Sequence, residues 1–305
     1  MKETLSRIVE ANRFHTKNGT LANYIPELAK ANPSTLAICI CDHTGNCTQA
    51  GDFKTPFTIQ SVSKVITLLY ALEYYGENIF TRIGVEQTAD AFNSIIKLET
   101  RNHGKPLNPL INAGAIATIA YVAEHEGKGT FRKLSGFLRK LARNDSIHVN
   151  QDVYASEKRT GDINRALAYF QKGVHSFDAS VEIVLDTYFQ MCSLEVHVKD
   201  LACIAQVLAN NGVIAETGER LFSEKTAKMT KSIMTTCGMY DSSGQFALTV
   251  GIPSKSGVGG GILSVVPGRY GIGTLGPALD EKGNSAAGVK LLSQLSEELN
   301  LSIFQ

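Results

Sequence analysis

The N-terminal part of the chain combines short apolar runs with turn residues. Residues 36–41 are continuously apolar, residues 42–45 include Asp42 and Gly45 and are typical of a turn, and residues 47–49 resume an extended pattern. This order predicts a β-hairpin. Residues 1–10 mix charged and apolar side chains, which indicates an amphipathic helix and not a secretion signal.

The central half of the chain repeats apolar positions at helical intervals. Asn210, Asn211 and Gly212 follow the last periodic segment and are typical of a helix C-terminus. Residues 60 to about 213 are therefore predicted to be largely α-helical. The predicted helices cover 61–75, 112–125, 131–143, 162–172, 181–192 and 197–209.

The C-terminal part returns to β-like patterns after a further predicted helix over 223–235. Apolar runs at 246–250, 262–266 and 270–272, with a turn at Pro267 and Gly268, predict three adjacent antiparallel strands. Residues 285–299 place Val289, Leu292 and Leu295 at helical intervals, which predicts a helix that packs on this sheet.

Sheet segments from both ends of the sequence thus flank a helical insertion. The predicted fold class is α+β, with an antiparallel sheet flanked by helices and a mostly helical domain. We assign residues 1–60 and 221–305 to a discontinuous sheet domain and residues 61–220 to the helical domain. The active site is expected between them.

The size and charge of the chain favour a small-molecule substrate. A chain of 305 residues with 43% hydrophobic residues can bury a substantial core. Its 30 basic and 29 acidic residues leave a formal net charge of +1, so no overall field favours nucleic acid or an acidic membrane surface as partner. The longest apolar stretch, 113–123, falls short of the ~20 residues that a membrane span requires.

The cysteines and histidines indicate neither a disulfide framework nor a metal site. The histidines lack the i, i+4 pairing or neighbouring cysteine couples of zinc sites, so no metal is expected. The cysteines form no CxxC pair, which predicts free thiols in a reducing cytoplasm. They are Cys39, Cys41, Cys47, Cys192, Cys203 and Cys237.

Ser61 and Lys64 lie three residues apart at the start of a strongly apolar segment. On a helix this spacing brings the hydroxyl and the amine to one face, where a neutral lysine can take the serine proton. Burial and the helix N-terminus would both lower the pKa of Lys64. A second match, Ser94 to Lys97, lies in a mixed segment, and about one such match is expected by chance.

Lys255-Ser256-Gly257 occurs once, far downstream, and glycines follow it. With the SxxK pair it resembles the two elements that meet across the cleft of serine penicillin-recognising enzymes. On its own the triplet could be an exposed lysine at a turn. The glycines could form a β-bulge or let the backbone approach a ligand closely.

Seven ordered blocks then make the chain resemble the serine-dependent glutaminase family, from about residue 24 to residue 284. That family has the β-lactamase/transpeptidase type of fold. The matching blocks are 23–26, 57–64, 108–116, 156–157, 188–193, 237–241 and 255–262.

The resemblance implies that Ser61 is the nucleophile and Lys64 its general base. Tyr188 or Tyr240 is implied as a proton relay, and the sequence does not decide between them. Backbone N–H groups of Ser61 and Val258 would form the oxyanion hole. The implied substrate-binding positions are Tyr24, Gln60, Asn112, Glu157, Asn164, Tyr188, Tyr240 and Val258, with Glu157 pairing the α-ammonium of glutamine.

Without the resemblance, several of these residues have ordinary explanations. Asn112 could be a helix N-cap, Glu157 a loop acid, and Tyr188 a core residue. The family commonly has arginine where Ile163 stands, which puts a local ion pair in doubt but not the role of Asn164.

The implied reaction is hydrolysis of L-glutamine to L-glutamate and ammonia through a glutamyl ester of Ser61. No cofactor is expected, and the resemblance implies a homo-oligomer, either a dimer or a tetramer. Two other functions stay open: a β-lactamase or DD-peptidase, and a non-catalytic amino-acid-binding module. The former predicts export and an S-D-N or Y-x-N element, to which Tyr188-Phe189-Gln190 is the nearest match. The intact Ser61 and Lys64 argue against the latter.

Overall fold

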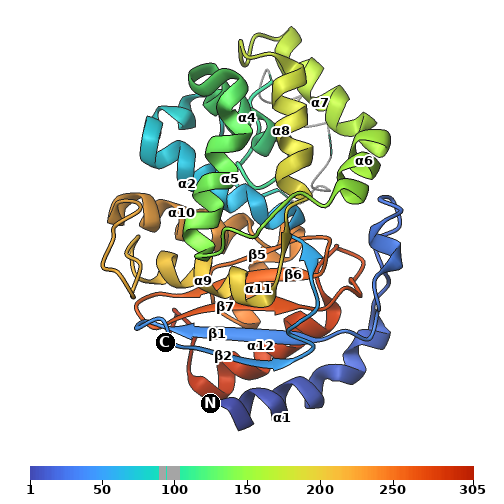
Figure 1. Ribbon diagram of the computed structural model, residues 1–305, viewed down its shortest axis with the longest axis vertical. Coiled ribbons are helices and arrows are strands. Elements are labelled where there is room, and N and C mark those ends of the chain that lie inside the picture. Colours follow the sequence, from blue (N-terminus) through green and yellow to red (C-terminus); the bar gives the residue numbers. More distant parts are fainter. Residues whose placement is uncertain (89–93, 95–103) are drawn as a thin grey trace.

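Strands from both ends of the sequence form one five-stranded sheet in the computed structural model, which describes residues 1–88, 94 and 104–305 (Figure 1). The strand order is β2-β1-β7-β6-β5, and all neighbouring pairs are antiparallel. The predicted hairpin and the α+β class are thereby confirmed. The strands are β1 (Ala37–Asp42), β2 (Cys47–Gly51), β5 (Ser254–Ser256), β6 (Gly261–Val266) and β7 (Tyr270–Leu275).

The alternation of side chains along β1 determines which helices cover each face of the sheet. Ile38 and Ile40 pack with α1 (Lys2–Asn12) and α12 (Ala286–Leu299), which are the predicted terminal helices. Cys39 and Cys41 lie on the opposite face, against α9 (Val198–Ala209). The sheet is therefore buried on both sides.

The remaining helices of the central segment share a second, larger apolar core. Figure 1 shows them grouped on one side of the sheet, with α1 and α12 beyond its other side. Each of the predicted helices is present within two residues of its expected ends. The helices that pack in this second core are α2 (Ser63–Tyr75), α4 (Asn112–Glu126), α5 (Thr130–Ala142), α6 (Gln151–Thr160), α7 (Asp162–Gly173), α8 (Val181–Cys192) and α10 (Glu224–Cys237).

The assignment of residues 61–220 to a separate helical domain stays a prediction. One helix of that range packs on the sheet and not with the other helices alone. Helix α9 lies on β7, β1 and β6. Its close approach to β7 depends on two glycines. A Cβ at Gly271 would lie 2.0 Å from the backbone nitrogen of Gln206, and a Cβ at Gly273 would lie 2.2 Å from the carbonyl oxygen of Val198.

Two segments differ from the sequence prediction. The predicted strand 246–250 is wrong, because residues Ser243–Thr249 form the helix α11. Phe246 and Val250 are buried one helical turn apart, while Leu248 is 87% exposed, as expected for a helix. In the sequence alone, an apolar run of only five residues does not distinguish a short helix from a strand. Helix α6 was not predicted at all; Asn150 caps its N-terminus by accepting from the backbone N–H of Val153.

The prediction of six free thiols is wrong for one pair. Cys41 and Cys47 are direct partners in the β1–β2 register and are joined by a disulfide. Residues directly opposite each other in an antiparallel pair project to the same face, so the hairpin itself brings the two sulfurs together. Cys39, Cys192, Cys203 and Cys237 are buried and free.

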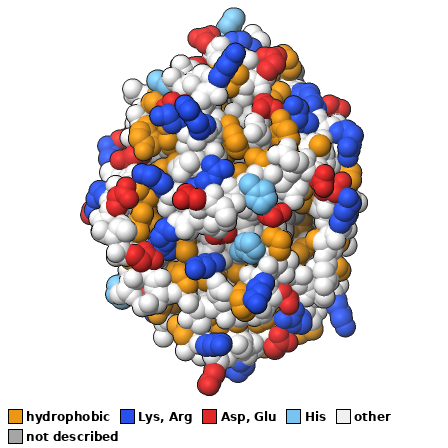
Figure 2. Space-filling view, viewed as in Figure 1, with side chains coloured by type: hydrophobic (Ala, Val, Ile, Leu, Met, Phe, Trp, Pro, Cys, Tyr) orange, Lys and Arg blue, Asp and Glu red, His pale blue; other side chains and the backbone are white. Residues whose placement is uncertain are grey.

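In the described part of the chain, no helix combines the length and apolar character needed to cross a membrane. On the face seen in Figure 2, acidic and basic side chains are interspersed. This distribution matches the near-zero formal net charge.

We expect Gly271→Ala to destabilise the fold by about 3 kcal/mol, because the added methyl would overlap the backbone of α9. Urea unfolding followed by circular dichroism would measure the change. Gly136→Ala is the matched control, because a Cβ at that position in α5 meets nothing within 4 Å and should stabilise the helix by about 0.5–1 kcal/mol. Equal midpoints for the two variants would contradict the proposed contact.

Candidate active site

Ser61 lies in a single 3₁₀ turn, Gln60–Val62, that leads into α2. The turn follows β3 (Phe57–Thr58), which pairs with β4 (Glu195–Val196). Gln60 has a φ of 48°, an uncommon left-handed conformation for a non-glycine residue. Since the first N–H groups of a helical turn have no partner within it, the backbone N–H of Ser61 is suited to receive a ligand.

The glycine-rich loop after β5 lies directly against this turn. A Cβ at Gly257 would lie 2.9 Å from the carbonyl oxygen of Ile59 and 3.4 Å from the backbone nitrogen of Ser61. A Cβ at Gly259 would lie 2.6 Å from the carbonyl oxygen of Thr58. The SxxK and KSG motifs, distant in sequence, therefore meet through a contact that only glycine permits.

Lys64 is almost completely buried, with 2% of its surface exposed. Its Nζ donates to Oδ1 of Asn112 at 2.6 Å, and Nδ2 of Asn112 donates to Oδ1 of Asn164 at 2.9 Å. Burial lowers the pKa of Lys64 from 10.5 to about 8, although Cys192 and Glu157 oppose the shift. An amine with this pKa can act as a general base near neutral pH.

The side chain of Asn112 does not cap its helix. Asn112 is the first residue of α4, the capping position is Ile111, and no side-chain cap bond is present there. Its amide is used instead to connect Lys64 with Asn164. The N-cap explanation of Asn112 is therefore wrong.

Lys255 is fully buried on β5 and is not an exposed turn residue. Its Nζ donates to the carbonyl oxygen of Ser256 at 2.5 Å and lies 4.2 Å from the centroid of the Tyr240 ring. Burial, followed by the charge of Lys64, lowers the pKa of Lys255 well below its ordinary value.

Tyr240 connects the two motifs. Its hydroxyl donates to the carbonyl oxygen of Ser256 at 3.2 Å and also hydrogen-bonds with the Ser61 side chain. Burial raises the pKa of Tyr240 above its ordinary range, so the hydroxyl keeps its proton. Its φ of 54° is again left-handed.

Glu157 and Tyr188 complete the other wall of the site. Glu157 projects from α6, not from a loop, and burial raises the pKa of its carboxyl group to about 7 against a hydrogen bond from Gln60 and the charge of Lys64. Tyr188 lies on α8, where it hydrogen-bonds with Cys192 one turn later. Burial raises the pKa of Tyr188 and brings that of Cys192 to about 12.

These side chains surround an inner cavity of about 70 Å³. Eight of the ten predicted site residues line it: Tyr24, Gln60, Ser61, Asn112, Glu157, Asn164, Tyr188 and Val258. Lys64 reaches the cavity through Asn112, and Tyr240 reaches it through Ser61. The structure thus brings all ten together, and their individual roles stay predictions.

Sequence reasoning missed Cys192, Thr160 and Gly161, which also line the cavity. It placed the triplet that begins with Lys255 across the cleft from Ser61 but gave Lys255 itself no role. Cys192 could have been found from its helical spacing of four from Tyr188. The second SxxK match ends at Lys97, outside the described residues.

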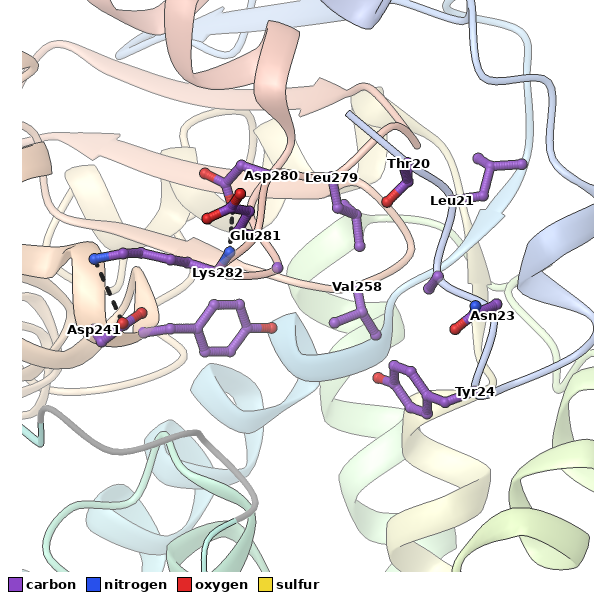
Figure 3. A pocket seen from close by; sticks show the side chains of 13 residues that line it. Thr20, Leu21, Asn23, Tyr24, Asp241, Val258, Leu279, Asp280, Glu281 and Lys282 are labelled. Carbon is purple, nitrogen blue, oxygen red and sulfur yellow. Dashed lines mark hydrogen bonds and ion pairs between the residues drawn. The ribbon is translucent and has the colours of Figure 1, made fainter. Parts of the chain in front are cut away.

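A wider outer pocket of about 570 Å³ adjoins the inner cavity. Figure 3 shows Val258 facing Tyr24, and both residues line the two spaces. The segment before Tyr24 is held by paired backbone hydrogen bonds between Thr20 and Leu279. Asp241 and Lys282 form an ion pair of 3.4 Å at the far side of the pocket. The two spaces therefore meet at Tyr24 and Val258.

Comparison with known proteins gives one consistent result. The chain matches the family described as Glutaminase over residues 19–304. It is 54% identical to a glutaminase of Clostridium tetani over 305 residues, which is 100% of both chains.

Two solved structures extend the likeness to the fold. A probable glutaminase of Bacillus subtilis has a TM-score of 0.92 at 38% identity, over 99% of this chain and 97% of that chain. The covalent complex of a Bacillus subtilis glutaminase with 5-oxo-L-norleucine, formed by reaction with 6-diazo-5-oxo-L-norleucine, has a TM-score of 0.90 at 36% identity and 99% coverage of both chains. The predicted β-lactamase/transpeptidase-like fold is confirmed.

We expect Lys64→Met to stabilise the protein by about 2 kcal/mol at pH 7, since burial of the ammonium costs free energy and Met has a similar length. A lysine whose pKa is lowered on folding destabilises fully below its folded pKa of about 8, and the cost fades as pH rises toward its unfolded value of 10.5. The difference between variant and wild type should therefore shrink at alkaline pH.

Urea midpoints at pH 7 and pH 9.5 would measure this trend. Lys54→Met is the control, because Lys54 is exposed and its removal should leave the midpoint unchanged. A Lys64→Met protein that is less stable than wild type at pH 7 would show that the ammonium is not a net cost.

Proposed function

The chain belongs to the glutaminase family, and from this premise we propose how its site hydrolyses L-glutamine to L-glutamate and ammonia. The observation that carries the proposal is the convergence of a serine hydroxyl, a buried amine of lowered pKa and a buried carboxyl group at one cavity. The covalent complex that a Bacillus subtilis relative forms with 5-oxo-L-norleucine supports a covalent mechanism.

Substrate binding rests on polar groups of complementary charge. The Glu157 carboxylate pairs with the α-ammonium of glutamine, and Gln60 holds this carboxylate by a hydrogen bond. The amides of Asn112 and Asn164 and the hydroxyl of Tyr188 bind the remaining polar groups of the amino acid. Tyr24, 51% exposed at the mouth of the cavity, lies over the bound substrate.

Acylation begins when neutral Lys64 takes the proton of Ser61 and the Ser61 oxygen attacks the side-chain carbonyl carbon. The backbone N–H groups of Ser61 and Val258 stabilise the oxyanion of the tetrahedral intermediate. The C–N bond then breaks, and the nitrogen leaves as ammonia after it receives a proton. Tyr240 is the better candidate for relaying this proton, because its hydroxyl hydrogen-bonds with Ser61 while that of Tyr188 is engaged with Cys192.

Deacylation repeats these steps with water. Lys64 accepts a proton from the water molecule that attacks the glutamyl ester, and the tetrahedral intermediate uses the same oxyanion hole. The ester bond breaks, Ser61 regains its proton, and glutamate leaves through the outer pocket. Lys255 contributes a buried donor behind Tyr240, and it holds the Ser256 carbonyl to which Tyr240 donates.

The alternative functions receive less support. A family match over residues 19–304 favours a glutaminase over a β-lactamase or DD-peptidase. The lowered pKa of Lys64 favours catalysis over ligand binding alone, since a binding module has no use for a neutral buried amine.

We also propose that the protein is a cytoplasmic homo-oligomer, a dimer or a tetramer. The family resemblance supports the assembly, and the four free cysteines support the compartment. The disulfide between Cys41 and Cys47 reduces the support that the cysteines give to a reducing compartment. Light scattering after gel filtration would measure the assembly.

We expect Ser61→Ala to lower ammonia release from glutamine by about 10⁴-fold or more with an unchanged circular dichroism spectrum. Treatment with 6-diazo-5-oxo-L-norleucine should add mass to the peptide that contains Ser61 in the wild type only. Ser232→Ala, at an exposed position of α10, is the matched control. Retained turnover, or labelling of another residue, would refute the assignment of Ser61.

The pH dependence of kcat/KM should reveal two groups that act in their unprotonated forms. The pKa of Lys64 is about 8 and that of Glu157 is about 7. Thus kcat/KM should level off above about pH 8, fall with a log slope near 1 between pH 8 and 7, and fall more steeply below pH 7.

Glu157→Gln tests the lower limb of this profile. The variant should raise KM about 100-fold, because the substrate ammonium loses its partner, and it should keep only the inflection near pH 8. Persistence of the steeper fall below pH 7 in this variant would exclude Glu157 as its source.

A further inference from the structure

Four of the six cysteines meet on the face of the sheet that packs against α9, away from the active-site cavity. We propose that in the reduced protein Cys39, Cys41, Cys47 and Cys203 form a four-sulfur site for one thiophilic d¹⁰ cation, of the class of Zn²⁺, Cu⁺ or Cd²⁺. The oxidised form, in which Cys41 and Cys47 are joined, cannot hold the ion.

The hairpin and the helix place the sulfurs together for separate reasons. Cys39 and Cys41 are two residues apart on β1 and share a face, and Cys47 is opposite Cys41 on β2. Cys203 projects from α9 toward this face, with its Sγ 4.0 Å from that of Cys41. The sulfur atoms of Cys39, Cys41 and Cys47 all lie within 4.8 Å of one another.

The separations within the hairpin and between Cys41 and Cys203 are compatible with tetrahedral thiolate coordination once the Cys41–Cys47 bond is broken. With metal–sulfur bonds of about 2.3 Å, the sulfurs of a tetrahedral site are about 3.8 Å apart. Thiolate ligands select soft cations such as Zn²⁺ and Cu⁺ over Mg²⁺ or Ca²⁺.

Three of the four cysteines are buried, and the fourth lies on the edge strand of the sheet. Cys39 and Cys41 are fully buried and Cys203 is 2% exposed. Cys47 is half-buried on β2, the edge strand, and gives an ion a path of entry.

Two cations compensate the charge that thiolates would bring. Lys199 favours the ionised forms of Cys39 and Cys203, and the positive charge of Arg143 favours that of Cys203, while Asp200 opposes both. Nη2 of Arg143 is buried without a hydrogen-bond partner among the described nitrogen and oxygen atoms. This guanidinium N–H group is thus available to an anionic sulfur.

Without an ion the thiols remain neutral, since burial raises the pKa of Cys39 to about 12 and also raises that of Cys203. A divalent cation that displaces four thiol protons forms a tetrathiolate centre of net charge −2. Lys199 and Arg143 offset this charge in part, since Arg143 also forms an ion pair with Glu216 at 2.7 Å. The Cys41–Cys47 disulfide must first be reduced by a dithiol, which becomes a cyclic disulfide as the two cysteines gain its protons and electrons.

Cadmium titration of the reduced full-length protein under anaerobic conditions tests the proposal. We expect a near-ultraviolet thiolate-to-cadmium absorption band that saturates at one Cd²⁺ per chain, and a rise in Tm with Cd²⁺. Protein oxidised with diamide, in which Cys41 and Cys47 are joined, should show neither. Cys41→Ser and Cys203→Ser, each left with three thiolates, should lower the intensity of the band and weaken Cd²⁺ binding.

Cys237→Ser is the matched control, because Cys237 is buried and free but lies outside the cluster, and it should keep the full band. Glutamine hydrolysis and Tm without cadmium show whether each variant is folded. Should Cys41→Ser or Cys203→Ser fail to fold, Cys47→Ser at the half-buried edge position replaces it. No saturable band in the reduced wild type, or a band unaffected by loss of a cluster cysteine, overturns the proposal.

Discussion

The chemistry of this site depends on an amine kept out of water. Lys64 hydrogen-bonds with a neutral amide, Asn112, and not with a carboxylate. A carboxylate at that distance would favour the ammonium form and raise the pKa back toward 10.5, so the lysine could no longer accept a proton near neutral pH. The lowered pKa of Lys64 therefore depends on a neutral asparagine as its hydrogen-bond partner as much as on burial.

The Glu157 carboxyl group, which shares the cavity with Lys64, is only partly ionised near neutral pH. Burial raises the pKa of Glu157 to about 7, so its charge supports the ammonium form of Lys64 less than an ordinary glutamate would. The α-ammonium of a bound amino acid restores that charge, because it stabilises the carboxylate directly. Substrate binding and the ionisation of the empty site are thus coupled through one acid.

The sequence predicted elements with long periodic patterns well, and short or composite features less well. The helix 181–192 was predicted at its observed ends because its apolar period extends over more than three turns. Residues 246–250 were too few to separate a strand from α11, and α6 has few apolar residues to reveal it. The site residues were assembled by resemblance, whereas the burial of Lys255 and the disulfide depend on strand partners that no local pattern encodes.

Among the described non-glycine residues with positive φ, two lie at the reaction centre, Gln60 and Tyr240. Gln60 and Tyr240 both have positive φ, a conformation that costs about 1 kcal/mol or more for a residue with a side chain. Glycine would relieve this strain, but the Gln60 amide bonds to both Thr58 and Glu157, and the Tyr240 phenol bonds to Ser61. The two residues are positioned on either side of the reacting hydroxyl by surroundings that include the glycine loop packed on residues 58–61. The fold therefore uses glycine where the backbone must approach closely, and accepts strain where a side chain is required at the reaction centre.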